Sequence, residues 1–445
     1  MHATDKTNDV HNNLGNVSQV VHVAWPIVIS MLSFTAMDVC DTLFVGWIGK
    51  TELAAVGLAT VALFLLNSFF LGTMRGVNIL GAQATGAGRP ARAIQIGFMG
   101  ALLAVPFGLV VVGASLFDEQ IFALLGGSPQ VQSIARDYFG VRALGTAFWY
   151  VTLALAGYFQ STGDTRTPMY VNLLANGLNI ALDPLLIFGL GPIPALGVEG
   201  AAIATIIAQA AGMLAILPIF IVRTGIHHRV DLEAARSILR VGVPVGVHFA
   251  TGVGAFVVFT SFLARMGEDE LAAHMIALKI ISVSFLPGRG VSDAACILVG
   301  QFVGANDLAS ARRAFRSALK LTLVVMGSCA LVFWLFPEPL VLAFNRDPNT
   351  VAIACKLLVI AAIFQIFDAT AMVSSGALNG TGDTQFTMWT SIVCGWFILV
   401  PLAYAFAFVL GWGATGAWLA LVVEMAVVAL ITTARFVGNG WQRTP

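Results

Sequence analysis

Twelve apolar runs of about 20 residues or more recur along this 445-residue chain, and they constrain its fold more than any other feature. A helix of that length crosses a hydrocarbon core of roughly 30 Å. Only 10% of the residues are charged, whereas soluble domains carry about 25%. The runs lie near residues 20–47, 53–80, 93–116, 132–158, 167–190, 198–222, 237–264, 271–300, 314–335, 351–378, 386–410 and 414–435. We therefore predict an all-α polytopic membrane protein with twelve transmembrane helices.

The chain also repeats itself at a nearly constant offset. The segment "GKTELAA" at 49–55 matches "GEDELAA" at 267–273, an offset of 218 residues. The same offset relates Pro26 to Pro244 and "ILGAQATGA", which starts at Ile79, to "ILVGQFVGA", which starts at Ile297. The phrase TGDT at 162–165 returns at 381–384, an offset of 219. We infer two copies of one six-span unit.

An even number of spans per copy makes the two copies parallel repeats, because both enter the membrane from the same side. Transporter sites in proteins of this construction lie at the repeat interface. The domain organisation that we predict is a polar cytoplasmic tail at 1–18, an N-lobe at 19–222, a cytoplasmic linker at 223–236, a C-lobe at 237–436 and a C-terminal tail at 437–445.

Lys and Arg are distributed unevenly between the loops. The two termini and the even-numbered loops hold fourteen of these residues, and the odd-numbered loops hold three. Cytoplasmic loops carry an excess of Lys and Arg. We therefore expect both termini in the cytoplasm and a multi-pass protein of the cytoplasmic (inner) membrane.

The two TGDT phrases fall between the fourth and fifth spans of each copy. Gly163 and Gly382 suit a tight turn, and Asp164 and Asp383 suit the cap of the helix that follows. The letters GTGD at 380–383 also match the GxGD pattern of intramembrane aspartyl proteases, but that chemistry needs a second membrane-embedded aspartate. No GxxxxGK[ST] motif for ATP hydrolysis occurs. We expect structural turns and no enzymatic activity.

Carboxyl groups inside the apolar runs are the main functional candidates, because a charge at the bilayer centre costs about 2.5–3.5 kcal/mol. They are Asp38, Asp41, Asp183, Asp293, Asp368 and Glu424.

The fifth span carries a polar stripe at Asn172, Asn176, Asn179 and Asp183. This spacing places the four side chains on one face of a helix, turned toward protein or water. Hydrogen bonding between helices would also explain such a stripe. In the sixth span, Thr205 and Gln209 lie one turn apart.

Together these features resemble the multidrug and toxic compound extrusion (MATE) family. The resemblance rests on the twelve spans, the parallel halves, "VCDT" at 39–42, "NGLNIALD" at 176–183 and the two TGDT loops, and it covers essentially the whole chain. It implies two six-helix bundles around a central cleft and an antiport activity.

Within the family the chain is most similar to the DinF-like branch, which implies a cation site in the first half. The residues implied by that resemblance are Asp41, Asn179, Asp183 and Thr205, with Tyr138 in the same pocket. Asp38 and Asn176 are neighbouring candidates. Pro26 corresponds to a proline at which the first span bends, and it is the expected hinge.

The second half departs from the NorM-like branch of the family. That branch uses a pair of carboxylates, of which Asp368 is present, but Gly252 stands where the second would fall. Lys279 and Arg289 form a cationic patch that could pair with Asp293 or Asp368, or bind an anionic part of a substrate. The roles of Asp38 and Asp368 stay open.

The residues themselves suggest a mechanism. Two aspartates that face each other in a poorly hydrated lobe cannot both ionise cheaply, so we expect one to hold a proton. Protonation removes charge and lets the first span repack, with Pro26 as hinge because proline interrupts the helical hydrogen-bond ladder. A cationic substrate would favour the deprotonated form. Sodium could use the same oxygens of Asp41, Asn179, Asp183 and Thr205.

We therefore predict a secondary antiporter that exports organic, cationic or amphipathic compounds in exchange for protons, or for Na+. The alternative is a lipid-linked precursor flippase of the same superfamily, although such proteins typically carry extra spans and a strongly cationic cleft. The expected partners are small organic substrates and the lipid bilayer. We expect no nucleic acid, no cofactor other than the coupling ion, and a monomer.

Overall fold

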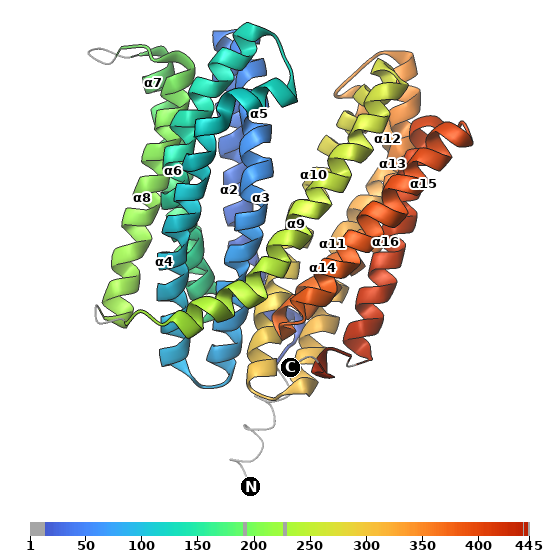
Figure 1. The fold of residues 1–445 in the computed structure, drawn as a ribbon. Helices are drawn as coiled ribbons and strands as arrows, with labels where there is room; N and C mark the ends of the chain where they lie inside the picture. The colour runs from blue at the N-terminus through green and yellow to red at the C-terminus, as the bar shows by residue number, and fades with distance from the viewer. Residues whose placement is uncertain (1–13, 190–193, 226–228, 439, 444–445) are drawn as a thin grey trace. The chain divides into compact units, whose positions relative to one another are not determined.

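The computed structural model describes residues 14–189, 194–225, 229–438 and 440–443. Within these residues the chain forms helices, turns and short loops, and no strand (Figure 1). The helices are α2 Val17–Ile48, α3 Lys50–Gly86, α4 Pro90–Ala114, α5 Asp118–Leu125, α6 Pro129–Ser161, α7 Arg166–Phe188, α8 Gly197–Thr224, α9 Leu232–Met266, α10 Glu268–Gly304, α11 Leu308–Leu335, α12 Pro337–Leu342, α13 Pro348–Thr381, α14 Thr384–Ile392, α15 Val400–Tyr404 and α16 Gly413–Val437.

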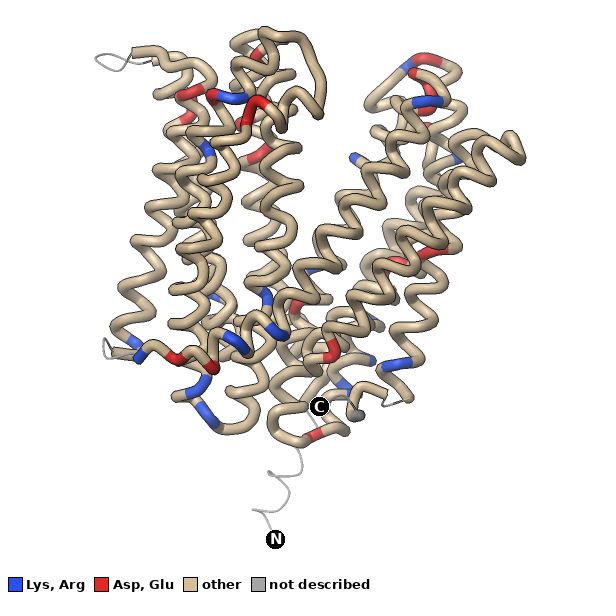
Figure 2. Tube along the Cα trace, viewed as in Figure 1, with Lys and Arg blue, Asp and Glu red and all other residues tan. Residues whose placement is uncertain are grey.

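The prediction of twelve spans is confirmed. Among the described residues, twelve helical stretches are long and apolar enough to cross a membrane, and each coincides with one predicted run. The eleventh, Thr384–Val409, comprises α14, a π-helical segment at Val393–Leu399, α15 and a second π-helical segment at Ala405–Val409. Figure 2 shows that most charged residues lie toward the helix ends, whereas the middle parts are largely uncharged. The fifth run, predicted to reach 190, ends at Phe188 because Gly189 turns the chain with φ +77°.

The chain divides into two compact units, which we describe separately. The N-unit comprises Ile29–Thr85 and Arg89–Gly246, and the C-unit comprises Met1–Val28, Gly86–Gly88 and Val247–Pro445. The boundaries differ from those of the predicted lobes, because they fall inside α2 and α9 rather than in the linker. Each boundary lies close to the repeated proline of that helix, Pro26 in α2 and Pro244 in α9.

Close approach of small residues explains why the boundaries lie inside these helices. A Cβ atom on Gly72 of α3 would lie 2.6 Å from the Cα atom of Gly246, so the beginning of α9 packs directly on α3 within the N-unit. In the C-unit, a Cβ on Gly290 of α10 would lie 3.4 Å from the backbone nitrogen of Val28 in α2. Membrane helices use small residues in this way, because lipid provides no hydrophobic force that brings them together.

The linker predicted at 223–236 is largely helical where it is described. Helix α8 continues to Thr224, and α9 already begins at Leu232. Asp231 explains the early start, because its Oδ1 accepts hydrogen bonds from the N–H groups of Glu233 (2.9 Å) and Ala234 (3.0 Å).

Both TGDT phrases form tight turns with the same backbone geometry, as predicted. Gly163 and Gly382 adopt φ values of +93° and +91°, a region that favours glycine. The N–H of the following aspartate donates to the carbonyl oxygen five residues earlier, at 2.9 Å for Asp164 and 3.1 Å for Asp383. Glycine in this conformation commonly ends a helix.

The two aspartates nevertheless act differently. Asp164 caps α7, because its Oδ1 accepts the N–H of Thr167 at 3.0 Å, and its Oδ2 also lies 2.5 Å from Nη1 of Arg223. The predicted cap at Asp383 is wrong, since that side chain makes no capping hydrogen bond. It is buried and pairs instead with Nε of Arg435, at 2.9 Å. Asp383 thus forms an ion pair with Arg435 of α16 instead of capping its own helix.

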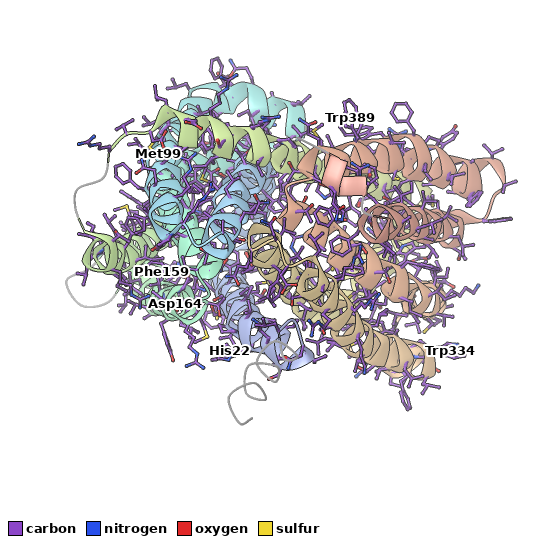
Figure 3. The ribbon with its side chains drawn as sticks, turned by 90° about the horizontal axis from the view of Figure 1, so that it is seen from below. His22, Met99, Phe159, Asp164, Trp334 and Trp389 are labelled. Atoms are coloured by element: carbon purple, nitrogen blue, oxygen red, sulfur yellow. The ribbon has the colours of Figure 1, made fainter. Side chains whose placement is uncertain are left out.

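The contacts of Asp164 also set its pKa. Burial raises the pKa of this carboxyl group, but the hydrogen bonds from Thr167 and Arg223 outweigh burial and leave it below its ordinary value. The guanidinium of Arg223 also lies over the ring of Phe159, 5.2 Å from its centroid. Figure 3 shows Phe159 and Asp164 close together, seen from this end of the helices.

Candidate functional site

The polar stripe of α7 is buried within the N-unit. Asn179 and Asp183 are both 0% exposed and Asn176 is 8% exposed, whereas Asn172 is half-buried. The spacing therefore predicted the shared face correctly. Asn176 Nδ2 donates to Ser33 Oγ at 2.8 Å, which connects α7 to α2.

Asp41 of α2 meets Asp183 of α7. Their carboxyl groups are close enough to act directly on each other. Ionised carboxylates only accept hydrogen bonds, so a hydrogen bond between these two groups requires a proton on one of them. Apart from this contact, neither oxygen of Asp183 has a hydrogen-bond partner among the described residues. The arrangement therefore fits a shared proton.

Helix α8 contributes neutral oxygen atoms to the same region. Asn179 Nδ2 lies 3.4 Å from Thr205 Oγ1, which itself donates to the carbonyl oxygen of Ala201 at 3.0 Å. Asn179 Oδ1 and Gln209 Oε1 are buried and have no partner in the described part of the chain. Buried acceptors without donors cost free energy. These oxygens would gain from a proton or a cation placed between them.

Helix α6 supplies Tyr138 and a residue that we did not expect, Arg142. Tyr138 is buried, and the positive charge of Arg142, one turn later in the sequence, acts on it electrostatically. The guanidinium acts electrostatically on both Asp41 and Asp183. We considered acidic residues and the cations of the second half, and so missed this one. The signal was available, because an arginine inside an apolar span is unusual for the same reason as an aspartate.

Two predicted residues lie apart from this cluster. Asp38 is exposed on α2, within electrostatic range of Asp41. Pro26 lies in the part of α2 that belongs to the C-unit, and α2 continues through it as one helix. Its role as a hinge stays a prediction.

The C-unit has its own buried carboxyl groups. Asp368 on α13 and Glu424 on α16 are each 5% exposed and close enough to interact electrostatically. Arg289 acts on Asp368 and forms an ion pair with Asp293, with Nε 3.7 Å from Oδ1. Of the alternatives left open for Arg289, the structure shows the ion pair with Asp293.

The two halves differ at the position of the N-unit carboxylate. The repeat aligns Asp41 with Phe259, which is fully buried in the apolar core of the C-unit. Its ring lies 5.7 Å from that of His274, and the same separation relates His274 to Trp418. Gly252 is half-buried, and a Cβ there would meet only Ser391 Oγ, at 3.7 Å. The cluster around Asp41 thus has no copy among the described residues of the C-unit.

None of the described residues forms a group of three or more His, Cys, Asp or Glu side chains able to hold a metal ion.

Comparisons with known proteins agree with this architecture. The profile of the MatE family matches residues 26–185 and 244–405, so it matches once in each repeat and begins at Pro26 and Pro244. The chain is 31% identical over 432 residues to a protein of Pseudomonas putida described as "Probable multidrug resistance protein NorM", covering 94% of this chain and 93% of the relative. A protein of Deinococcus radiodurans with the same description is 32% identical over 429 residues, covering 94% of both chains.

Solved structures share the fold. One is described as an outward-facing conformation of a multidrug resistance MATE family transporter of the MOP superfamily, with a TM-score of 0.88, 22% identity, and coverage of 96% of this chain and 97% of that chain. A MOP superfamily transporter from Pyrococcus furiosus gives the same values. The relatives carry the name NorM, and assignment to the DinF-like branch stays a prediction. The profile matches in both repeats and the identity over nearly the whole length show that this chain belongs to the MATE family.

Proposed function

We propose that this protein is a secondary antiporter that exports organic, cationic or amphipathic compounds in exchange for protons. The contact between Asp41 and Asp183 is the observation that carries the proposal. Relatives about 30% identical are described as multidrug resistance proteins, which supports small organic compounds as the substrate class.

The chemistry follows from the charges of this cluster. One proton between the two carboxyl groups leaves one negative charge, which Arg142 balances. Loss of that proton adds a negative charge to a poorly hydrated region, where an uncompensated charge is costly. A cationic substrate bound in the N-unit would compensate that added negative charge. Binding of the substrate and binding of the proton would therefore compete. Competition of this kind is the minimum that antiport requires.

The orientation of the protein is part of the proposal. Fourteen Lys and Arg residues lie in the termini and even-numbered loops, against three in the odd-numbered loops. This asymmetry supports cytoplasmic termini in the inner membrane. We propose that the chain acts as a monomer and catalyses no chemical reaction.

A lipid-linked precursor flippase is the less favoured alternative. The family match, the relatives named for multidrug resistance, and the twelve spans found among the described residues support the antiporter. Sodium as the coupling ion is the other open choice.

The test is efflux of a fluorescent organic cation from liposomes that contain the purified protein. A proton gradient should drive efflux in the wild type. Asp41→Asn and Asp183→Asn should abolish gradient-driven efflux while dye binding is retained, because asparagine keeps the shape and hydrogen-bonding reach but cannot carry a proton in exchange. Asp38→Asn, on the same helix but exposed, should have a much smaller effect. Wild-type efflux from both Asp41→Asn and Asp183→Asn would refute the proposal.

A separate variant addresses the C-unit. Asp368→Asn should reduce efflux less than the two N-unit variants if the N-unit alone carries coupling. A loss as large as that of Asp183→Asn would instead mean that both units take part.

A further inference from the structure

Two basic side chains of α11, Arg316 and Lys320, lie one turn apart on the exposed face of that helix. Neither forms a hydrogen bond or an ion pair with any of the described residues. Arg92, near the beginning of α4 in the N-unit, pairs by contrast with Asp231 at 2.7 Å. The two charges of α11 therefore have no counter-ion within the described part of the chain.

Lys320 marks the level at which α11 enters the apolar part of the membrane. Residues 321–335 of α11 contain no charged side chain, and at 1.5 Å per residue they rise about 22 Å. This is most of a hydrocarbon core of roughly 30 Å. Trp334, which is 63% exposed near the other end of the helix, suits the opposite interface. Arg316 and Lys320 therefore lie at the level of the lipid head groups, on the side proposed to be cytoplasmic.

The surface beside the two cations is hollowed and continues into an apolar wall. The hollow has a volume of about 390 Å³, and the described residues that line it are Arg316, Leu319, Lys320, Leu323 and Val324, all on α11. Val324 is 61% exposed and lies one turn deeper than Lys320. Positive charge thus gives way to exposed apolar surface with increasing depth. A phospholipid has the complementary order, an anionic phosphate followed by acyl chains.

The first repeat lacks this pair of cations. The offset of 218 residues places Phe98 and Leu102 of α4 at the positions of Arg316 and Lys320. Apolar side chains therefore serve the shared scaffold in one copy, so the fold does not require cations here. The rule for membrane orientation counts cations in a loop, and it does not require them on one exposed face of a helix. The pair on α11 therefore calls for a ligand.

We propose that Arg316 and Lys320 form a binding site for an anionic phospholipid of the cytoplasmic leaflet. The phosphate group lies between the two cations, and the acyl chains lie along Leu323 and Val324. Cations beside the membrane surface attract anionic lipids, and a guanidinium binds phosphate through two parallel N–H groups. This site is separate from the coupling cluster, which belongs to the N-unit, whereas α11 belongs to the C-unit.

The test is native mass spectrometry of the purified protein in detergent micelles with phosphatidylglycerol and phosphatidylethanolamine of identical acyl chains. The wild type should retain phosphatidylglycerol in preference to phosphatidylethanolamine. The double variant Arg316→Gln, Lys320→Gln should lose this preference, and its affinity for phosphatidylglycerol should fall at least about tenfold. The exchange Arg316→Lys, Lys320→Arg keeps both charges and should bind the lipid as the wild type does.

A matched control is the double variant Arg236→Gln, Arg240→Gln in α9. It removes the same charge at the same spacing from the same proposed side of the membrane. In α9 the next turn brings Pro244, which is buried, so no exposed apolar wall follows the two cations. This control should retain most of the preference for phosphatidylglycerol.

Four results would overturn the inference. An equal loss in the α9 control would mean that the lipid responds only to total charge, and a wild type without preference would mean that no such site exists. Displacement of the lipid from the wild type by millimolar inorganic phosphate would mean that the cations take a free anion and that the apolar wall has no part. A wild-type dimer that the α11 double variant converts into a monomer would mean that a second copy of this chain covers the face.

Discussion

Removing the aspartate from each TGDT turn should have unequal effects on stability, although the two phrases are identical in sequence. The side chain of Asp164 is 25% exposed and that of its partner Arg223 is 50% exposed. An ion pair so open to solvent contributes at most about 1 kcal/mol. The lost cap of α7 costs about 1 kcal/mol. We expect Asp164→Ala to lower the free energy of unfolding by about 1.5 kcal/mol.

The second turn has no cap to lose but a more deeply buried pair. The side chain of Asp383 is only 2% exposed and that of Arg435 is 27% exposed. Removing one partner of a buried pair costs about 3–5 kcal/mol, because the other charge is left uncompensated. Arg435 keeps its position over the ring of Phe386, 4.7 Å from the centroid. We therefore expect the lower end of that range, about 3 kcal/mol, for Asp383→Ala.

The assay is denaturant unfolding in mixed micelles, followed by tryptophan fluorescence. Asparagine variants serve as matched controls. Asp164→Asn should recover most of the loss, because asparagine is as good a cap as aspartate. Asp383→Asn should recover little, because it leaves Arg435 without a counter-charge. Equal losses in the two alanine variants, or a larger loss for Asp164→Ala, would refute the reasoning. Proton-driven efflux by the folded variants should persist, since neither turn belongs to the proposed coupling site.

Three further predictions follow from particular contacts. Gly72→Ala should lower the free energy of unfolding by about 1–3 kcal/mol, because the new Cβ would meet the backbone of α9. Gly57→Ala on the same helix is the control. Its Cβ would meet nothing within 4 Å, so the variant should be neutral or stabilising in the same assay. Single cysteines in place of Glu233 and Asn349 should react from opposite sides of the membrane with an impermeant thiol reagent in intact cells, and same-side labelling would contradict the proposed orientation. Because the pKa of Asp164 is depressed in the folded state, its contribution to stability is complete above the ordinary aspartate pKa of 3.8. That contribution is lost as the pH falls through the lower folded-state pKa. Unfolding midpoints measured from pH 5 to about pH 2 should therefore fall more steeply for the wild type than for Asp164→Asn.

Much of the candidate site could be predicted from the sequence. The spacing of Asn176, Asn179 and Asp183 placed them correctly on one buried face of α7, because a helix has a fixed number of residues per turn. Asp41 and Thr205 were also candidates from the spans themselves. The family resemblance joined them to this stripe and added Tyr138, and the structure brings all of these residues to the same unit. It did not indicate Arg142, because the resemblance transfers only residues that match a known pattern.

Local rules were unreliable where a partner from another helix competes. Aspartate before a helix favours a cap, and this rule holds for Asp164. It fails for Asp383, because Arg435 of α16 lies within 2.9 Å and a charged partner in a buried position outweighs a single backbone N–H. Nothing in the letters TGDT distinguishes the two cases.

The sequence by itself determined the properties that belong to single segments and to their repetition. Hydrophobic length determined the twelve spans, the recurring offset determined the two halves, and glycine in TGDT determined the turns. The tertiary structure alone decided which side chains from different helices meet. It brought Asp41 to Asp183 and Arg142, placed Phe259 in an apolar core at the equivalent repeat position, and divided the compact units inside α2 and α9. The physical reason is that such contacts depend on how each helix is rotated about its axis and how closely it approaches its neighbours, and small residues on several helices set both together.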